Sequence, residues 1–174
     1  MQKFSHIFAY MKLSNSFNDF EAVDELGPSF IGLQLYQLLS VINVQGNKLL
    51  KDLNLEIPSR VASSLMLLKI NGPMSVTQLG STLNMSHQLM AHRIKTLKEL
   101  KLIIQKKDPN DGRRMLFHLT YKGDQLASNL QKVSQIAIDG YMDLYEELDV
   151  NLYEALIKAR KLLLKKPLYE RIKD

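Results

Sequence analysis

Basic side chains are concentrated in one stretch of this 174-residue chain. Residues 86–114 hold eight Lys or Arg and three Asp or Glu, whereas the rest of the chain holds fifteen residues of each sign. The net charge of +5 therefore comes from this stretch alone. Lysine and arginine gathered in one segment neutralise phosphates, so the charge distribution favours a nucleic-acid backbone as partner. A solvated basic helix face is the alternative that a charge cluster by itself leaves open.

A short helix is predicted just before the basic stretch. Ser75 is a good N-cap, because its hydroxyl can accept an unpaired backbone N–H of the first turn. Val76, Leu79 and Leu83 follow helical spacing. Residues 84–86 then form a turn, which makes this helix the first of a helix-turn-helix pair.

The second helix of the pair carries the residues suited to recognition. Ser86 can cap it, and Met90, Ile94 and Leu97 recur at i, i+4 and i+7, so they should face the core. Small, polar and basic side chains suit a DNA major groove. The residues left on the other faces, free to meet a partner, are His87, Gln88, Ala91, His92, Lys95 and Lys98.

A β-hairpin is predicted to follow. Residues 103–107 and 115–119 have strand patterns, and Asp108-Pro-Asn-Asp-Gly112 between them carries turn chemistry. Arg113 and Arg114 at its tip could enter a narrow minor groove, where arginine is favoured by the negative potential. We expect phosphates to be neutralised by Lys95, Lys98, Lys106 and Lys107, base edges to be read by Gln88 and His92, and minor-groove width to be read by Arg113 and Arg114.

The remaining chain predicts helices. A long and very apolar helix is expected from Phe30 to Leu55, a third helix over 59–71, and two helices after Tyr121, the last capped by Asp149. The apolar excess of the long helix indicates subunit contact, with a central core helix of a monomer as the alternative. We therefore expect a mainly α fold with a small β-hairpin wing, that is, a winged helix-turn-helix flanked by N- and C-terminal dimerisation helices. The predicted organisation, one domain overall, is an N-terminal extension over 1–26, a dimerisation helix over 27–57, the DNA-binding region over 58–120 and dimerisation helices over 121–174.

Two smaller features are each open to two interpretations. Phe4, Ile7, Phe8 and Met11 could form a helical face in an arm that covers the dimer partner or an effector cleft, or, as we favour, in an ordinary packing helix with a solvated linker. A second basic cluster over 158–166 could touch flanking phosphates, but a solvated helix face is the favoured interpretation.

Catalytic and cofactor-binding motifs are absent from the sequence, so neither an enzyme nor a cofactor is expected. The chain has no cysteine, which excludes disulfides, thiolate metal sites and cysteine redox sensing and agrees with a reducing cytoplasm. His87 and His92 are five residues apart, so one helix face does not align them as metal ligands. We expect no membrane span and a cytoplasmic location.

The chain resembles the MarR family of bacterial winged-helix regulators over about residues 27–165. The resemblance rests on the helix-turn-helix over 72–86 and, more specifically, on Asp111-Gly-Arg113 followed by Leu119-Thr-Tyr-Lys-Gly123. It implies a homodimer that binds a pseudo-palindromic site on double-stranded DNA, often released by a small aromatic or anionic effector. By position, His87, Gln88, Ala91 and His92 match base-facing residues, and Asp111 and Arg113 match a wing pair in which Asp orients and Arg enters the minor groove.

Two positions depart from the family pattern. Lys101 stands where the family usually has Gly, and Arg93 stands where it usually has an apolar residue. The operator therefore cannot be inferred from relatives. A winged-helix protein–protein interaction module that has lost DNA binding is the alternative function, although the local charge of +5 argues against it.

Overall fold

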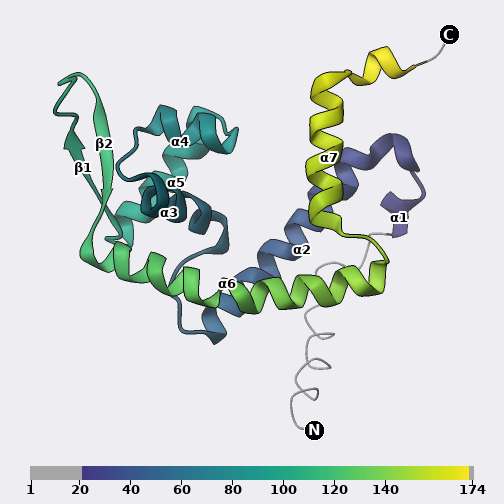
Figure 1. Ribbon diagram of the computed structural model, residues 1–174, viewed down its shortest axis with the longest axis horizontal. Coiled ribbons are helices and arrows are strands. Elements are labelled where there is room, and N and C mark those ends of the chain that lie inside the picture. The colour runs from purple at the N-terminus through teal and green to yellow at the C-terminus, as the bar shows by residue number, and fades with distance from the viewer. Residues whose placement is uncertain (1–20, 173–174) are drawn as a thin grey trace, which may run out of the picture. The chain divides into compact units, whose positions relative to one another are not determined.

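The computed structural model describes residues 21–172 (Figure 1). The predicted helical face of residues 4–11 lies outside these residues. The described chain is mainly helical with one antiparallel hairpin, as expected. It divides into two compact units, one ending at Arg60 and the other beginning at Val61.

The first unit contains the long apolar helix. A short helix α1 (Glu21–Asp24) and a 3-10 turn η2 (Pro28–Phe30) precede α2 (Ile31–Asp52). Helix α2 ends three residues before the predicted Leu55, because Leu53 forms its C-cap and Asn54 takes a positive φ of 56°. Of the described residues of α2, Leu50 alone is buried.

The base of α2 is joined to the next segment by a close approach. A Cβ placed on Gly46 would lie 3.3 Å from the Cβ of Ser59. The Ser59 backbone N–H donates to Asn47 Oδ1 at 2.7 Å, and its hydroxyl donates to the Asn43 carbonyl at 3.2 Å. Gly46 therefore allows α2 and Ser59 to approach closely.

The winged helix-turn-helix begins in the second unit. Helix α3 (Ser59–Asn71) ends at Gly72, whose φ of 76° stops the helix, and α4 (Val76–Leu83) and α5 (His87–Glu99) follow. The hairpin consists of β1 (Ile103–Lys107) and β2 (Met115–Leu119). Most core side chains of this unit come from these elements: Val61, Leu65, Leu68, Leu79, Met90, Ile94, Leu97, Ile103 and Phe117, with Leu102 just before β1.

Both predicted N-caps are present. The Ser75 hydroxyl accepts from Gln78 N at 3.2 Å, and Gln78 Oε1 accepts from Ser75 N at 2.9 Å, which completes a capping box. The Ser86 hydroxyl accepts from Leu89 N at 3.3 Å. Asn84 closes α4 in the left-handed conformation, with φ of 50°, so the turn between the helices is fixed by local chemistry at each end.

The hairpin is anchored to the helices by β2. Gln105 lies opposite Phe117 in the antiparallel register. On its other side Phe117 pairs with Met74, its N–H donating to the Met74 carbonyl at 2.9 Å. Below the sheet, Thr120 caps the following helix, and Gly123 packs so tightly that an added Cβ would lie 2.0 Å from the Leu102 carbonyl oxygen.

Two terminal helices complete the second unit. Helix α6 (Tyr121–Leu148) runs from the base of the hairpin, α7 (Leu152–Lys165) turns away from its end, and a 3-10 turn η3 (Leu168–Arg171) follows (Figure 1). The prediction that Asp149 caps the last helix is wrong: Asp149 is the left-handed C-cap of α6, with φ of 51°, and Asn151 caps α7 by accepting from Glu154 N at 3.1 Å. Within residues 21–172, no helix is long and apolar enough to cross a membrane.

Candidate nucleic-acid interface

Helix α5 separates a buried face from an exposed recognition face. Met90 and Leu97 are fully buried and Ile94 is 5% exposed, so the predicted core face is confirmed. The candidate base-reading residues are all exposed and lie in the first two turns after the Ser86 cap: His87, Gln88, Ala91 and His92. Because the opposite face packs in the core, these side chains occupy a fixed surface that can meet a groove.

The basic side chains of α5 differ in their surroundings. Lys95 is well exposed and its ammonium lies 3.9 Å from Glu99 Oε1, a weak i,i+4 pair. Arg93, at a position where the family usually has an apolar residue, donates to the Ser63 hydroxyl of α3 at 3.0 Å. Arg93 therefore ties the recognition helix to α3.

Lys98 is exposed, as expected, but its ammonium also has two partners within the protein that the sequence did not predict. Its ammonium donates to Gln105 Oε1 of β1 and lies 5.2 Å from the centre of the Phe117 ring on β2. An ammonium over an aromatic face is attracted by the ring quadrupole. Lys98 therefore joins the last turn of α5 to both strands of the hairpin.

The tip of the hairpin is shaped by two aspartates. Asp108 Oδ1 accepts from Asn110 N at 2.9 Å, and Asp111 Oδ1 accepts from Arg113 N at 3.0 Å. The Asp111 carboxylate therefore fixes the backbone from which the Arg113 side chain projects. Arg114 closes the turn through its backbone, and its Nε lies 4.0 Å from Asp108 Oδ2.

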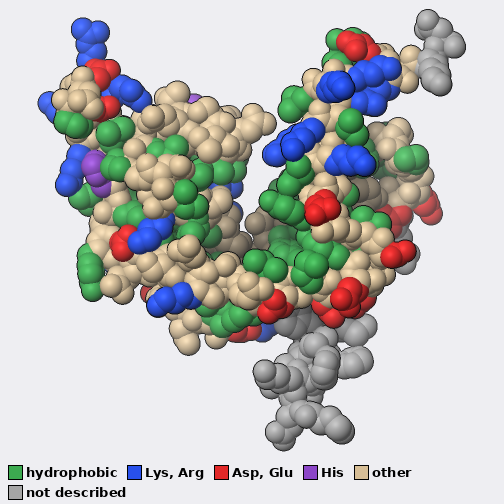
Figure 2. Space-filling model, viewed as in Figure 1, with side chains coloured by type: hydrophobic (Ala, Val, Ile, Leu, Met, Phe, Trp, Pro, Cys, Tyr) green, Lys and Arg blue, Asp and Glu red, His purple; other side chains and the backbone are tan. Residues whose placement is uncertain are grey.

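An open groove runs between the hairpin tip and the start of α4. It is lined by Ser75, Thr77, Gln78, Arg113, Arg114 and Met115. Figure 2 shows Lys and Arg side chains gathered at the end of the hairpin. The N-terminal end of a helix carries a partial positive charge, so this groove combines two arginines with a helix dipole of the same sign.

The other predicted groups fall outside this site or make no metal centre. Lys106 and Lys107 are exposed at the end of β1. His118 lies on β2 opposite Ile104. In the part of the chain that the structure describes, no three His, Cys, Asp or Glu side chains gather as metal ligands would.

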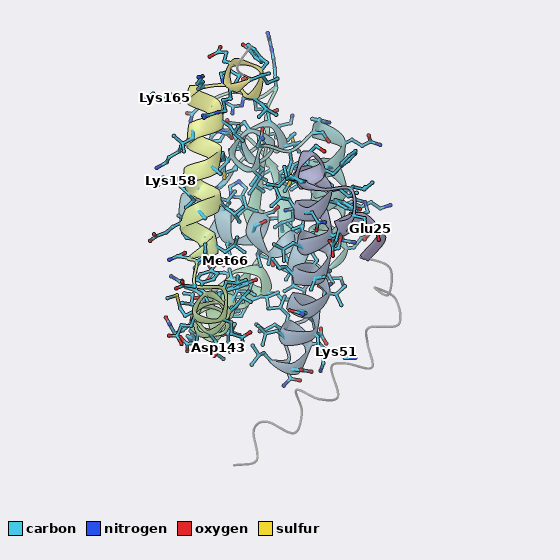
Figure 3. The ribbon with its side chains drawn as sticks, turned by 90° about the vertical axis from the view of Figure 1, so that its right-hand side faces the viewer. Glu25, Lys51, Met66, Asp143, Lys158 and Lys165 are labelled. Carbon is cyan, nitrogen blue, oxygen red and sulfur yellow. The ribbon has the colours of Figure 1, made fainter. Side chains whose placement is uncertain are left out.

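A second basic cluster lies on α7. Lys158 and Lys165 project from the same side of this helix (Figure 3). The cluster consists of Lys158, Arg160, Lys161, Lys165 and Lys166, all of which are exposed. A solvated face, the favoured interpretation from sequence, agrees with this exposure.

One backbone feature was not foreseen from the sequence. Lys101 has a φ of 58°, between α5 and β1. This left-handed conformation favours glycine, and the sequence resemblance had placed a family glycine at this position. A lysine at this position is therefore held in a backbone conformation that costs a residue with a side chain more than glycine.

Comparisons with known proteins give a family match for part of the chain and several similar folds. Residues 57–114 match a model of the MarR family. A MarR transcriptional regulator from Methanosarcina mazei Go1 is 19% identical with a TM-score of 0.61, covering 82% of this chain and 99% of its own. The MepR–DNA complex of S. aureus is 18% identical with a TM-score of 0.56, covering 72% and 96%. A probable transcriptional regulator from Pseudomonas aeruginosa is 23% identical with a TM-score of 0.52, covering 75% and 95%. No curated protein matches the chain in sequence.

The capped helix pair and the Arg-bearing hairpin define a winged helix-turn-helix fold. The family model spans this region and the structural likeness extends to the flanking helices. Residues 57–114 thus match the MarR family model, and the fold of the chain is that of MarR-type winged-helix proteins.

Proposed function

We propose that this protein is a homodimeric, sequence-specific regulator that binds a pseudo-palindromic site on double-stranded DNA. The observation that carries the proposal is the pairing of an exposed polar helix face with a basic hairpin in one rigid winged helix. The four exposed residues near the N-terminus of α5 are placed to read base edges in a major groove, as in other helix-turn-helix proteins.

The wing supplies the second contact in this proposal. Asp111 fixes the backbone of Arg113, so the guanidinium projects from an ordered tip. An arginine held in this way suits a narrow minor groove. The exposed side chains of Lys95, Lys106 and Lys107 are assigned to phosphates, which set the register of the protein on the duplex.

Dimerisation is supported by the apolar side chains that the single chain leaves exposed. In α2, Leu35, Tyr36 and Leu39 are 44%, 67% and 52% exposed. In α6 and α7, Leu148 and Leu163 are 48% and 49% exposed. Extensive exposed apolar surface marks a protein contact. A pseudo-palindromic DNA site has two equivalent halves, so the partner at this surface is proposed to be a second copy of the chain. Sedimentation equilibrium tests this step, since the proposal predicts twice the chain mass.

Release by a small aromatic or anionic effector is part of the proposal on the basis of the family resemblance. Such a ligand would change the spacing of the two recognition helices, so that they no longer fit successive major grooves about 34 Å apart. A panel of small aromatic carboxylates added to the preformed complex tests this step through loss of the DNA complex.

The wing role is tested by Arg113→Ala. We expect weaker DNA binding with an unchanged denaturation midpoint, because no described contact of the core involves the Arg113 side chain. A fluorescence-anisotropy titration with a duplex of the selected site measures the affinity. An affinity equal to that of the wild type would remove Arg113 from the interface.

A further inference from the structure

We infer that Lys98 is a positioning residue that fixes the recognition helix relative to the wing, and not a contact to a DNA phosphate. The inference rests on the proposed function. It distinguishes the role of Lys98 from that of Lys95, whereas the sequence alone assigned both lysines to phosphates.

Lys98 has two partners on the hairpin. Its ammonium donates to the Gln105 side chain and lies over the Phe117 ring at 5.2 Å. Gln105 and Phe117 face each other across the two strands, so one side chain reaches both strands at a single register position.

The aromatic partner is itself a fixed point of the fold. Phe117 is 3% exposed, pairs with Gln105 on one side and exchanges two backbone hydrogen bonds with Met74 on the other, at 2.9 and 3.3 Å. An ammonium bound to this ring is therefore attached to the most constrained part of the hairpin.

The position of Lys98 in its helix adds to this role. Lys98 is the basic residue of the last turn of α5, where a cation interacts favourably with the helix dipole. Directly after this turn the chain passes through the strained Lys101, with φ of 58°, into β1. A side-chain link across this junction holds α5 and the wing in one relative orientation.

The relative orientation of α5 and the hairpin matters because both are proposed to contact the same DNA duplex at the same time. The α5 side chains enter a major groove while Arg113 enters a minor groove, and both fit only if the helix and hairpin keep a fixed geometry. Loss of the link should weaken binding without removing any phosphate contact.

Salt dependence separates the two roles. Each phosphate contact contributes about 0.9 to the slope of log K against log salt, so a lysine that contacts phosphate in both subunits contributes about 1.8. Lys98→Met should weaken binding about three- to tenfold with an unchanged slope. Lys95→Met is the matched control, because Lys95 is one turn away on the same helix with its side chain 74% exposed; its slope should fall.

A double-mutant cycle identifies the partner. In a Gln105→Met background, Lys98→Met should have little further effect on affinity, because the link is already broken. Lys98→Arg, which keeps the charge and the donors, should restore most of the affinity. Denaturant midpoints of all variants check that the fold is retained.

The outcomes are distinct. A slope that falls by about as much in Lys98→Met as in Lys95→Met assigns Lys98 to phosphate and overturns the inference, while the proposed function stands. An unchanged affinity, or effects of Lys98→Met and Gln105→Met that simply add, also overturns it. If the wild-type protein has no salt-dependent duplex affinity, the proposed function fails and the inference with it.

Discussion

Replacing Lys101 with glycine should stabilise the protein. Lys101 has a φ of 58° at the junction of α5 and β1. Its backbone is held there by two hydrogen bonds: its N–H donates to the Lys98 carbonyl at 2.9 Å, and its carbonyl accepts from the Thr120 hydroxyl at 2.8 Å. The fold therefore imposes the left-handed conformation on Lys101. This conformation is unfavourable for a residue that has a Cβ atom.

The expected gain follows from two opposing effects. A side chain in the left-handed region costs about 1–2 kcal/mol, because Cβ approaches the following carbonyl oxygen. Glycine removes this cost but loses about 0.4–1 kcal/mol of additional backbone entropy on folding. The free energy of unfolding should rise by about 0.5–1 kcal/mol in Lys101→Gly.

Urea denaturation measures this difference as a higher midpoint with an unchanged slope. Lys101→Ala is the control, since it removes the same charge and side chain but keeps a Cβ. It should be no more stable than the wild type. If Lys101→Gly and Lys101→Ala have equal midpoints, the backbone conformation is not the cause, and the reasoning is refuted.

Three further changes test other parts of the fold. Gly123→Ala should destabilise by about 1–3 kcal/mol or more, because its Cβ would lie 2.0 Å from the Leu102 carbonyl oxygen; a midpoint like that of the wild type would contradict the close packing. Leu97→Ala, which removes a fully buried side chain, should cost about 2–5 kcal/mol in denaturant unfolding; a negligible change would mean that this helix face is misassigned. Burial and then the neighbouring Tyr145 raise the pKa of Tyr141 above its usual value of 10.0. Since the folded state favours the neutral phenol, this stabilisation is complete below pH 10 and is lost as the pH rises through the higher pKa of the folded state. Tyr141→Phe should therefore lose less stability than the wild type at alkaline pH; identical pH profiles would show that Tyr141 is not the group responsible.

Local chemistry made much of the fold predictable. Helix α3 occupies the predicted residues 59–71, and both strands occupy the predicted 103–107 and 115–119. Ser75 and Ser86 cap the two helices as expected. The caps depend on hydrogen bonds to residues close in sequence. The helices and strands follow from apolar residues that recur with a regular period.

The errors lie where the deciding contact is distant or where two residues have equal local preferences. Asp149 and Asn151 are both good N-caps, but Asp149 also tolerates the left-handed conformation that ends α6, and only the structure selects between these roles. Lys98 is exposed as predicted, but its protein partners were missed, because they lie on strands that the helical period of α5 does not describe. The left-handed conformation of Lys101 occurs in a turn whose carbonyl accepts a hydrogen bond from Thr120, which follows β2 and is distant in sequence.

Selection of bound sequences from a pool of random duplex DNA, at two salt concentrations, tests the central claim most directly. A homodimeric regulator predicts enrichment of a palindrome with half-sites about one helical turn, or 10 base pairs, apart, and an affinity that falls steeply with salt. Binding without sequence enrichment would contradict sequence-specific recognition. No binding at low salt would contradict the DNA-binding role itself and favour a winged helix that contacts another protein.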